Sequence, residues 1–575
     1  MNDASGGRER AYPRAPRKKK GRKDKQMKHI TKKRVLAVLV ATLVSAAVFW
    51  FMLPAINPLD PNFWLFLLIV VVAYAAAILF TGEKKTFSPT TIKVGSGANA
   101  QNLQFNLPKT RGLKITALVL LAGLAVAGIL WLIGLPIFNA SRYKDLLVRQ
   151  EGNFTEDIAE LSMNQIPVVD RDTAQRLGAR KLGEMSDLVS QFEIAPDYTQ
   201  INLNDRPVRV TPLIYGDIIK WFNNNSEGIS AYIQVDMVTQ ETTLVRLEQG
   251  MKYSPCEYLM RDLGRYLRFN YPTKIFDNFS FEVDEEGTPY WIAPTIRYRI
   301  GVWGGRDIGG AVLVNAVTGE HRYYPVEEIP QWVDQVYRAD IVMEQLNYNG
   351  KFQDGFWNSY FGQKGVLRAT EGYNYIAMND DVYLYTGMTS VASDQSNVGF
   401  VLINMRTKET KFYSVPGAEE LSAMSSAEGQ VQHLNYTSTF PLLLNVADRP
   451  TYFMSLKDAA GLVKMYAFVD VERYQLVGTG ATVDEARANY VKALSQETDV
   501  EAGGGEEKTG VIEKVSSAVV DGNTNYYFTL KGEPTVYVAS IQVSDRLPFL
   551  TPGDSVTFQY AGEPDNETCE VLSMQ

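Results

Sequence analysis

Three long apolar runs near the N-terminus dominate the hydrophobic pattern of the chain. Residues 35–53, 63–80 and 115–138 contain no charged side chain. A helix of about 20 apolar residues is long enough to cross the hydrocarbon core of a bilayer. The pattern therefore predicts a membrane region over residues 35–140. The three transmembrane helices predicted within it cover residues 35–56, 62–81 and 115–138.

Basic residues flank these runs unevenly. Residues 1–34 hold 14 Lys and Arg against three acidic residues, and the connection 82–114 is also basic, whereas residues 54–61 have no Lys or Arg. Basic residues near helix ends are retained on the cytoplasmic side. We therefore expect a multi-pass plasma-membrane protein with a cytoplasmic tail (1–34), a cytoplasmic loop (82–114) and a large extracytoplasmic C-terminal region. Because the tail adjoins the first run, we expect it to contact the lipid bilayer and not nucleic acid.

Beyond residue 170 the pattern changes to short strands that recur. A motif of four mostly apolar residues followed by Asp or Asn occurs four times, in Tyr232–Glu241, Ala311–Glu320, Phe400–Glu409 and Tyr466–Gln475. An Asx side chain can hydrogen-bond the turning backbone, so each copy predicts a β-hairpin. The turn positions, to which we assign a structural role, are Asp236, Asn315, Asn404 and Asp470, with threonines three residues later at Thr239, Thr318 and Thr407.

Further elements complete each copy of the motif. A polar turn leads into a strand ahead of each hairpin, at Asn204, Glu285, Asn379 and Ala447. Amphipathic segments between the copies predict helices. We expect four diverged α+β repeats over residues 171–498, after a juxtamembrane segment at 141–170. The predicted helices cover residues 181–192, 257–267, 330–348, 418–431 and 484–494.

A helix followed by a small antiparallel sheet, whose last hairpin reads apolar-Asn-Ala-x-Thr-Gly-Glu, resembles the PepSY family of extracytoplasmic modules. The resemblance is best at Val314–Glu320. It implies a binding or regulatory module, which in some members of the family is linked to inhibition of peptidases. The shared residues mainly form a hairpin turn, so no functional residue is carried over.

The C-terminal part differs from the repeats in composition. Residues 499–508 are rich in Gly and Glu, which is typical of a linker. Residues 509–575 contain five short strands and predict a small all-β barrel of the OB or SH3-like type. The predicted fold class is therefore an anchor of three transmembrane helices, α+β extracytoplasmic repeats of antiparallel sheet and helix, and this barrel.

Candidate chemistry is sparse. His321 lies in a hairpin strand and His433 near a helix end, and neither has a nucleophile motif beside it. The glycine cluster 301–310 lacks a phosphate-binding lysine and is interpreted as a hairpin connection. We predict no catalytic residue, no metal site and no cofactor. Acidic residues that recur at the turns are interpreted as solvated loop residues, namely Asp284, Glu285, Glu286, Asp380 and Asp381.

Cysteine usage and aromatic content complete the prediction. Cys256 and Cys569 lie in different predicted modules, so we expect two thiols and a fold held by hydrophobic cores. Abundant Tyr and Trp suit recognition surfaces, although alternating strands also bury them in part. The expected function is a non-enzymatic membrane-anchored envelope protein whose repeats bind, sense or scaffold an envelope protein or wall polymer. A peptidase regulator or inhibitor, an accessory subunit of a membrane complex, and any oligomeric state stay open.

Overall fold

The structure, a computed structural model, divides into two compact units. Unit 1 comprises 1–138, 255–276 and 296–306, and unit 2 comprises 139–254, 277–295 and 307–575. Parts of the predicted tail 1–34, loop 82–114, segment 141–170 and linker 499–508 lie outside the described residues. The residues that the structure describes are 20–81, 87–94, 101–108, 111–158, 166–391, 396–498, 506–520, 523–544, 546–561 and 568–574.

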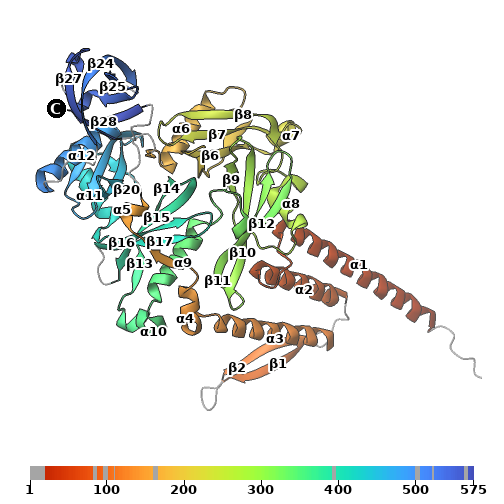
Figure 1. Ribbon diagram of the computed structural model, residues 1–575. Coiled ribbons are helices and arrows are strands. Elements are labelled where there is room, and N and C mark those ends of the chain that lie inside the picture. Colours follow the sequence, from red (N-terminus) through yellow and green to blue (C-terminus); the bar gives the residue numbers. More distant parts are fainter. Residues whose placement is uncertain are drawn as a thin grey trace, which may run out of the picture. The chain divides into compact units, whose positions relative to one another are not determined.

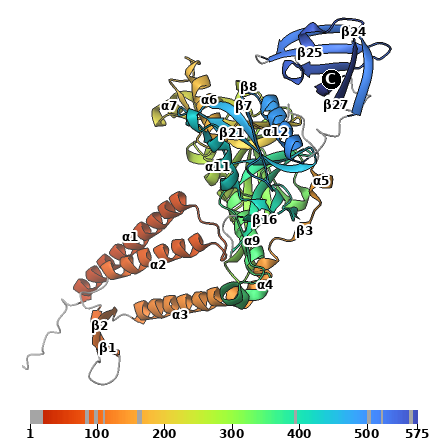
Figure 2. The same ribbon diagram turned by 90° about the vertical axis from the view of Figure 1, so that its left-hand side faces the viewer.

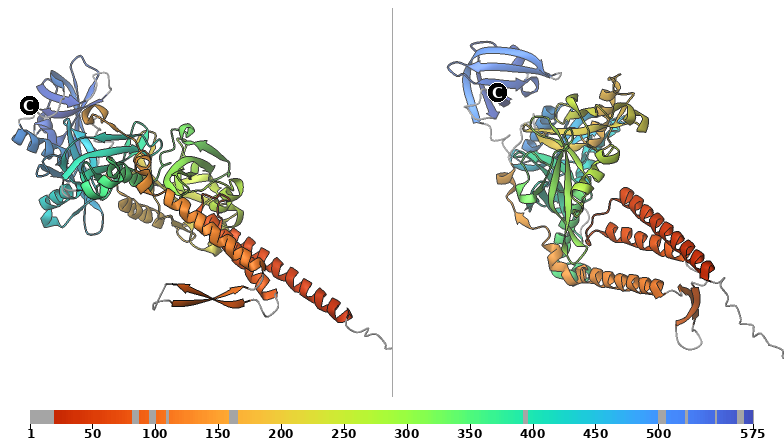
Figure 3. Two further views of the ribbon diagram at one scale, coloured as in Figure 1. Left: turned by 90° about the horizontal axis from the view of Figure 1, so that it is seen from below. Right: turned by 90° about the vertical axis from the view of Figure 1, so that its right-hand side faces the viewer.

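In unit 1, α1 (Lys20–Met52) and α2 (Pro61–Thr81) pack side by side as a helical hairpin, as Figure 3 shows. The rings of Phe49 and Phe66 meet edge to face with centroids 5.7 Å apart. The carboxylate of Asp60 closes the connection by accepting from the Ala55 N–H at 2.9 Å. An antiparallel ribbon of β1 (Phe87–Val94) and β2 (Gln101–Pro108) then precedes α3 (Arg111–Ile133).

The prediction of three transmembrane helices is wrong. Among the described residues, Lys32–Met52 of α1 is the one helix that is long and apolar enough to cross a bilayer unaided. The apolar helix Pro61–Ala77 in α2 is shorter than a crossing requires. The described apolar part of α3, Leu121–Ile133, is long and apolar enough to cross a bilayer only when it is joined with α4 (Pro136–Lys144). The two helices are bent by 51°. Multi-pass localisation is therefore unsupported, and the described chain is mainly a set of β-sheets with packed helices.

The physical reason for this error is that a composition window does not detect a helix break. Gly134 and Leu135 interrupt the third apolar run, and Pro136 starts a new helix because proline lacks the N–H that would continue the old one. The run 115–138 is uniformly apolar in sequence but is not one straight helix.

The first two repeats each contain an antiparallel sheet (Figure 1). In repeat 1 the strand order is β4-β6-β7-β8, with β5 beside β6, and in repeat 2 it is β12-β11-β10-β9. Repeat 1 consists of α6 (Arg171–Gly183), β4 (Phe192–Ile194), β5 (Thr199–Leu203), β6 (Arg206–Tyr215), α7 (Ile218–Asn224), β7 (Ile229–Asp236) and β8 (Thr242–Met251). Repeat 2 consists of η3 (Leu259–Arg261), α8 (Leu263–Asn270), β9 (Ser280–Val283), β10 (Pro289–Ile300), β11 (Gly304–Asn315), β12 (His321–Pro325) and η4 (Val326–Glu328).

The third and fourth repeats follow the same plan. The strand orders are β13-β15-β16-β17-β3 and β19-β21-β22-β23. Repeat 3 consists of α9 (Ala339–Lys351), α10 (Gly355–Trp357), the π-helix η5 (Asn358–Gly362), β13 (Leu367–Ala369), β14 (Asn374–Met378), β15 (Asp381–Ser390), β16 (Ser396–Asn404), β17 (Thr410–Tyr413) and β18 (Gly417–Ala418). Repeat 4 consists of α11 (Glu420–Gln430), η6 (Gln432–Leu434), β19 (Thr437–Ser438), β20 (Leu442–Val446), β21 (Arg449–Lys457), β22 (Val463–Asp470), β23 (Val477–Gly480) and α12 (Val483–Thr498).

Two helices differ most from the predicted positions. The prediction placed a helix at 181–192, whereas α6 ends at Gly183 and the chain then turns. It placed another at 330–348, whereas residues 330–338 are not helical and α9 begins at Ala339. Asp170 begins α6 as its N-cap, because its carboxylate accepts from the Thr173 N–H at 3.0 Å.

The predicted juxtamembrane segment contributes to the repeat sheets. Within 141–170, β3 (Arg149–Glu151) pairs in parallel with β17 of repeat 3. The short helix α5 (Phe154–Asp157) comes next, and the Asn445 amide of repeat 4 donates to the Ile158 carbonyl at 2.9 Å. The described part of this segment is therefore integral to repeats 3 and 4.

The four Asx residues lie at hairpin turns of one design. The Asn404 Oδ1 atom accepts from the backbone N–H groups of Arg406 and Thr407 at 2.9 and 2.8 Å. Asp236 and Asn315 make the same pair of bonds, whereas Asp470 accepts from one N–H, that of Arg473. The threonines add a further acceptor in the first three repeats, with Thr239, Thr318 and Thr407 accepting from the N–H of Glu241, Glu320 and Glu409.

The residue directly after each Asx links two parts of its repeat through its backbone N–H and carbonyl. The Met405 carbonyl accepts from Val336 and Tyr337, which lead into α9, while its N–H donates to Val382 at the start of β15. The other three repeats satisfy both backbone groups in this way with different side chains. The equivalent positions are Met237, Ala316 and Val471, which accept from segments 168–169, 252–253 and residue 418 and donate to Pro207, Pro289 and Pro450.

The C-terminal residues form a closed barrel in the order β24-β25-β26-β28-β27, visible in Figure 2. Phe528, Tyr537 and Phe558 pack in its core, with ring centroids 4.9 to 5.7 Å apart. The barrel strands are β24 (Glu506–Val520), β25 (Asn523–Leu530), β26 (Val536–Ser540), β27 (Ser555–Ala561) and β28 (Thr568–Met574), with η7 (Ile541–Val543) and η8 (Leu547–Phe549) between β26 and β27.

Replacing Asn404 by Ala tests the turn design. The substitution leaves two backbone N–H groups without their acceptor and removes the Nδ2 bond to Asp381, so the free energy of unfolding should fall by about 1–3 kcal/mol. Amide hydrogen exchange over residues 404–410 should accelerate locally. Thr407→Ala, which removes one acceptor at an exposed N–H, is the control with a smaller effect. Unchanged exchange in Asn404→Ala would contradict the assigned role.

Candidate functional site

The residues singled out from the sequence do not form one site. Asp236, Asn315, Asn404 and Asp470 each serve the hairpin of their own repeat, and the three threonines stay with them. The structure instead brings together the other set of turns, which connect the first strands of each repeat.

Turns from the first three repeats converge at one junction. Asn204, in the turn between β5 and β6, receives its contact from repeat 2, where the Glu285 carboxylate accepts from its N–H at 3.0 Å. The side chain of Asn202 contacts repeat 3, with its Nδ2 3.4 Å from the Asp380 Oδ1. Asn204 and Asp205, like Asn379 and Asp380, have positive φ angles, which Asn and Asp tolerate and which two-residue hairpins favour.

Two fully buried carboxylates lie at the centre of this junction. Glu282 in β9 is 0% exposed and Asp334, in the segment before α9, is 1% exposed. Glu282 accepts from the N–H groups of Asp334 and Gln335 at 2.9 and 3.2 Å. Asp334 in turn accepts from the Asn202 N–H at 2.7 Å through Oδ2, while its Oδ1 has no hydrogen-bond partner. The two carboxylates thereby join repeats 1, 2 and 3.

Burial shifts the protonation of both groups. It raises the pKa of Glu282 to about 7, against the opposing effect of the two N–H donors. Burial also raises the pKa of Asp334 well above its usual range, and the charge of Glu282 raises it further. A carboxylate is costly to desolvate, so a group with an unpaired oxygen holds its proton. The junction therefore titrates near neutral pH.

Of the two acidic turn residues predicted to be solvated in repeat 3, Asp380 is partly exposed and Asp381 differs from the prediction. Asp381 is buried and binds Arg406 in a two-pronged pair, with N–O distances of 2.7 and 2.8 Å. Asn404 donates to the same carboxylate at 2.9 Å, which connects the two turns of the repeat. Glu285 and Glu286 are exposed, as a solvated turn requires.

A second junction joins repeats 1, 3 and 4. It surrounds a cavity of about 20 Å³, enough for about one water molecule, lined by residues that include Asp170, Tyr375 and Ser455. Ser455 donates to the Val168 carbonyl at 2.8 Å. Lys457 donates to the Asp170 carboxylate, whose pKa lies below its usual range despite the burial that opposes this shift. This cavity is too small for an organic ligand.

An aromatic ladder on repeat 3 ends at the protein surface. Tyr348, Phe352, Phe356 and Tyr360 follow one another at a spacing of four residues, and successive ring centroids are 6.0, 6.2 and 4.9 Å apart. At the base, Tyr143 packs against Tyr348 at 4.8 Å, and Phe352 is 2% exposed.

At the surface end of the ladder, Trp357 and Phe361 lie near Tyr360 in sequence. We call Trp357, Tyr360 and Phe361 the aromatic ridge. These side chains belong to residues that are 62%, 53% and 80% exposed. Trp357 and Phe361 stack at 5.8 Å, and the Lys351 ammonium lies 4.5 Å from the Tyr360 ring centre. The ridge therefore presents a broad apolar surface on a rigid, packed base.

The remaining candidates carry no convergent chemistry. His321 begins β12 opposite Val314, and His433 is exposed in η6. Cys256 and Cys569 are both present as thiols. No group of three or more metal-binding side chains occurs in the described ranges. The glycine cluster 301–310 is the tip and one strand of the β10–β11 hairpin.

Sequence patterns gave little signal for the residues that do converge. Glu282 and Asp334 are separated by 52 positions, and nothing local marks either one as buried. The four-residue spacing of Tyr348, Phe352, Phe356 and Tyr360 is typical of one helix face and was a usable signal, although these residues lie on α9, its C-cap, α10 and η5. Our prediction looked for aromatics in strands and missed it.

Comparison with known proteins adds no identification. The sequence matches no protein-family model, and it matches no curated protein.

Replacing Asp334 by Asn tests the protonation of the junction. The folded state holds these protons more tightly than the unfolded state, so wild-type stability should fall as pH rises from the unfolded carboxyl value through the folded pKa of Glu282, about 7. Asn cannot ionise. We expect Asp334→Asn to raise the free energy of unfolding by about 1–3 kcal/mol at pH 8, and to converge with wild type only near the unfolded carboxyl pKa, at about pH 4.

Urea titrations across this pH range would measure the effect, with Glu241→Gln, at an exposed position, as the matched control. A variant that is less stable than wild type at every pH would show that Asp334 is ionised in the native junction.

Proposed function

We propose that this protein is a non-enzymatic, membrane-anchored envelope protein whose repeat region binds a partner protein through the aromatic ridge. The observation that carries the proposal is the exposure of Trp357, Tyr360 and Phe361 on a packed aromatic base. Large aromatic side chains supply much of the binding energy at protein interfaces.

The base of the ridge explains why it suits binding. Stacking of Trp357 on Phe361 and of Phe356 on Phe352 restricts the rotamers before any partner arrives. Binding then costs less side-chain entropy than it would on a flexible loop. Exposed aromatic clusters are unfavourable in water, so their presence on an ordered element favours a recognition role.

The chemistry of the ridge favours a protein partner with an apolar or aromatic surface. The ridge is mainly apolar, with Lys351 and Lys364 as its nearest basic residues in sequence. A partner that offers apolar side chains with carboxylates around them would complement it. A wall polymer, whose sugar rings also stack on aromatics, is the other outcome that the experiment separates.

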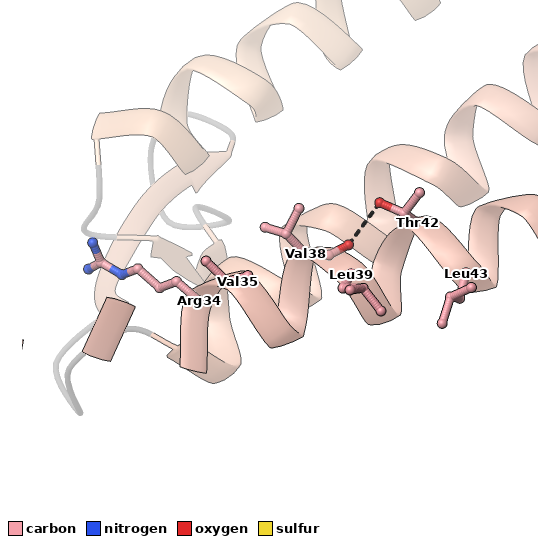
Figure 4. Close-up of a pocket in the computed structure, with 6 residues that line it drawn as sticks. All are labelled: Arg34, Val35, Val38, Leu39, Thr42 and Leu43. Atoms are coloured by element: carbon pink, nitrogen blue, oxygen red, sulfur yellow. Dashed lines mark hydrogen bonds between the residues drawn. The ribbon is translucent and has the colours of Figure 1, made fainter. Parts of the chain in front are cut away.

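The anchor in this proposal is α1. An N-terminal apolar helix such as Lys32–Met52 could be a membrane anchor or a signal sequence. Its apolar side chains are exposed, and a shallow surface crevice of about 480 Å³ is lined by Arg34, Val35, Val38, Leu39, Thr42 and Leu43 (Figure 4). The Thr42 hydroxyl donates to the Val38 carbonyl at 2.9 Å, which satisfies its donor without water. Lipid tails would fill such a surface.

Contacts at the C-terminal end of α1 favour the anchor over a cleaved signal. Arg268 donates through Nε to the Leu53 carbonyl at 2.9 Å, and the Pro272 carbonyl accepts from the Ile56 N–H at 2.7 Å. Both acceptor and donor follow α1, but within α1 itself Phe49 and Trp50 pack against Phe269 with ring centroids 6.2 and 6.3 Å apart, and removal of α1 would break these contacts. With the basic tail retained in the cytoplasm, one crossing by α1 places the C-terminal end of this helix at the outer face.

Replacing Trp357 and Phe361 together by Ser tests the ridge. After cross-linking in membranes and purification, the wild-type chain should retain a protein partner, and the double variant should lose most of it. Purified wall polymer forms a separate binding arm. The matched control is Ile219→Ser with Phe222→Ser, which removes two exposed apolar side chains from α7. Equal capture by all three chains would overturn the role of the ridge, and binding of polymer alone would replace the partner class.

Replacing Leu39 and Leu43 by Arg tests the anchor. Each charge at the middle of a span costs about 2.5–3.5 kcal/mol on insertion, so the variant should shift from the carbonate-resistant membrane fraction toward the soluble fraction. The same two substitutions at Ile219 and Phe222 should leave fractionation unchanged. A mature wild-type protein that starts after Met52 would identify α1 as a signal sequence instead.

A further inference from the structure

A second set of exposed apolar residues occurs in unit 1, at both ends of α8. Leu259 is 63% exposed, Met260 and Phe269 are each 48% exposed, and Tyr258 is 40% exposed. We call these four residues the α8 patch. The patch lies on η3 and on the last turn of α8, both of which belong to the same unit as α1.

Four contacts fix α8 to the C-terminal end of α1. The Phe269 ring packs against Phe49 and Trp50, with centroids 6.2 and 6.3 Å away. The Arg265 guanidinium lies 4.3 Å from the Trp50 ring centre. Arg268 donates to the Leu53 carbonyl, and it is itself buried. The patch is therefore held at the level where α1 ends.

The end of α1 has the composition of a membrane interface. Phe49, Trp50 and Phe51 close the apolar stretch, and Trp is enriched where a span meets the headgroups. Phe51 is 80% exposed. If α1 crosses the bilayer as proposed above, elements that contact these residues lie at the outer interface.

Backbone strain supports a role for the exposed leucine. Leu259 has a φ of +55°, a conformation that non-glycine residues adopt rarely and at a cost of about 1–3 kcal/mol. The Arg265 guanidinium donates to the Leu259 carbonyl and so holds this conformation. In water, exposure of the Leu259 side chain provides no free energy that would offset this backbone strain. In lipid, transfer of the side chain out of water offsets it.

Charge around the patch matches an anionic surface. Residues 255–276 include four basic residues against the acidic residues Glu257 and Asp262. Arg268 is buried and the Arg265 side chain is 13% exposed and stacked on Trp50, so Arg261 and Lys274 are the partly exposed cations. Glu257 is buried, and Asp262 caps α8 by accepting from the Arg265 N–H at 2.8 Å. Basic residues beside inserted apolar side chains are typical of peripheral membrane contacts.

We propose that Tyr258, Leu259, Met260 and Phe269 insert into the outer interface of the bilayer beside α1, with neighbouring basic side chains at anionic headgroups. This inference rests on the proposed anchoring role of α1. The contact gives unit 1 a second attachment to the membrane beside α1.

Depth-dependent quenching would test the insertion. A small fluorophore is attached to the full chain at Leu259→Cys, in a background where Cys256 and Cys569 are Ser, and the protein is reconstituted in vesicles of phosphatidylcholine with phosphatidylglycerol. Matched labels at Leu43→Cys in α1 and Ile219→Cys in α7 report lipid and water exposure; both native residues are exposed. Lipid-attached nitroxides should quench the Leu259 and Leu43 labels and spare the Ile219 label.

The outcomes separate the two proposals. Loss of quenching at Leu43 would overturn the anchor, whereas quenching at Leu43 with none at Leu259 would overturn the α8 patch alone. A Leu259 label that cross-links to a second copy, or that is shielded from both lipid and aqueous quenchers, would assign the surface to a protein and also contradict insertion.

A second variant separates insertion from folding. Asn tolerates a positive φ, so Leu259→Asn should preserve the loop while removing its apolar side chain. In this background a label at Met260→Cys should lose lipid quenching relative to the same label beside Leu259. Unchanged quenching would show that Leu259 does not insert, and omission of phosphatidylglycerol should weaken quenching if the basic residues contribute.

Discussion

The repeats depend on one backbone position, the residue that comes directly after each Asx. Its N–H and carbonyl are both satisfied inside the repeat, one by the preceding hairpin and the other by the segment that leads into the helix. Buried backbone groups must be paired, so this position fixes the register of the hairpins and the attachment of the leading segment together. Because the hydrogen bonds use only the backbone, Met237, Ala316, Met405 and Val471 can differ in size, although all four are buried and apolar. That explains how the repeats diverge and still share a fold.

The junction of repeats 1, 2 and 3 is formed by buried carboxylates, whose desolvation opposes folding. Glu282 and Asp334 are removed from water at a cost that backbone N–H donors offset in part. An apolar pair would have a smaller desolvation free energy, but it would not select one arrangement of hydrogen-bond donors. Carboxylates that must meet particular N–H groups of neighbouring repeats define a specific joint. The same burial raises the pKa of Glu282 to about 7, so the stability of this junction depends on pH near neutrality.

The parts of this fold that depend on local chemistry were accessible from the sequence. An Asx residue after an apolar strand stabilises the adjoining turn through its own side chain. The hairpins that lie at these residues are β7–β8, β11–β12, β16–β17 and β22–β23. The membrane region was not accessible in this way, because apolarity alone does not report the break at Gly134–Pro136 or the short apolar helix in α2. Neither was the junction, since Asn202, Glu282 and Asp334 meet only after three repeats have folded.

Backbone strain distinguishes unit 1 from the repeats. Among the described residues of unit 2, six of the ten non-glycine residues with positive φ are Asn or Asp, whose side chains tolerate it. Among the described residues two leucines share this conformation, Leu53 and Leu259, and both belong to unit 1. Each has its carbonyl held by an arginine of α8, Arg268 for Leu53 and Arg265 for Leu259. One short helix thus stabilises both the end of α1 and the exposed loop. A single element that sets these two positions is what a rigid attachment at a membrane surface requires.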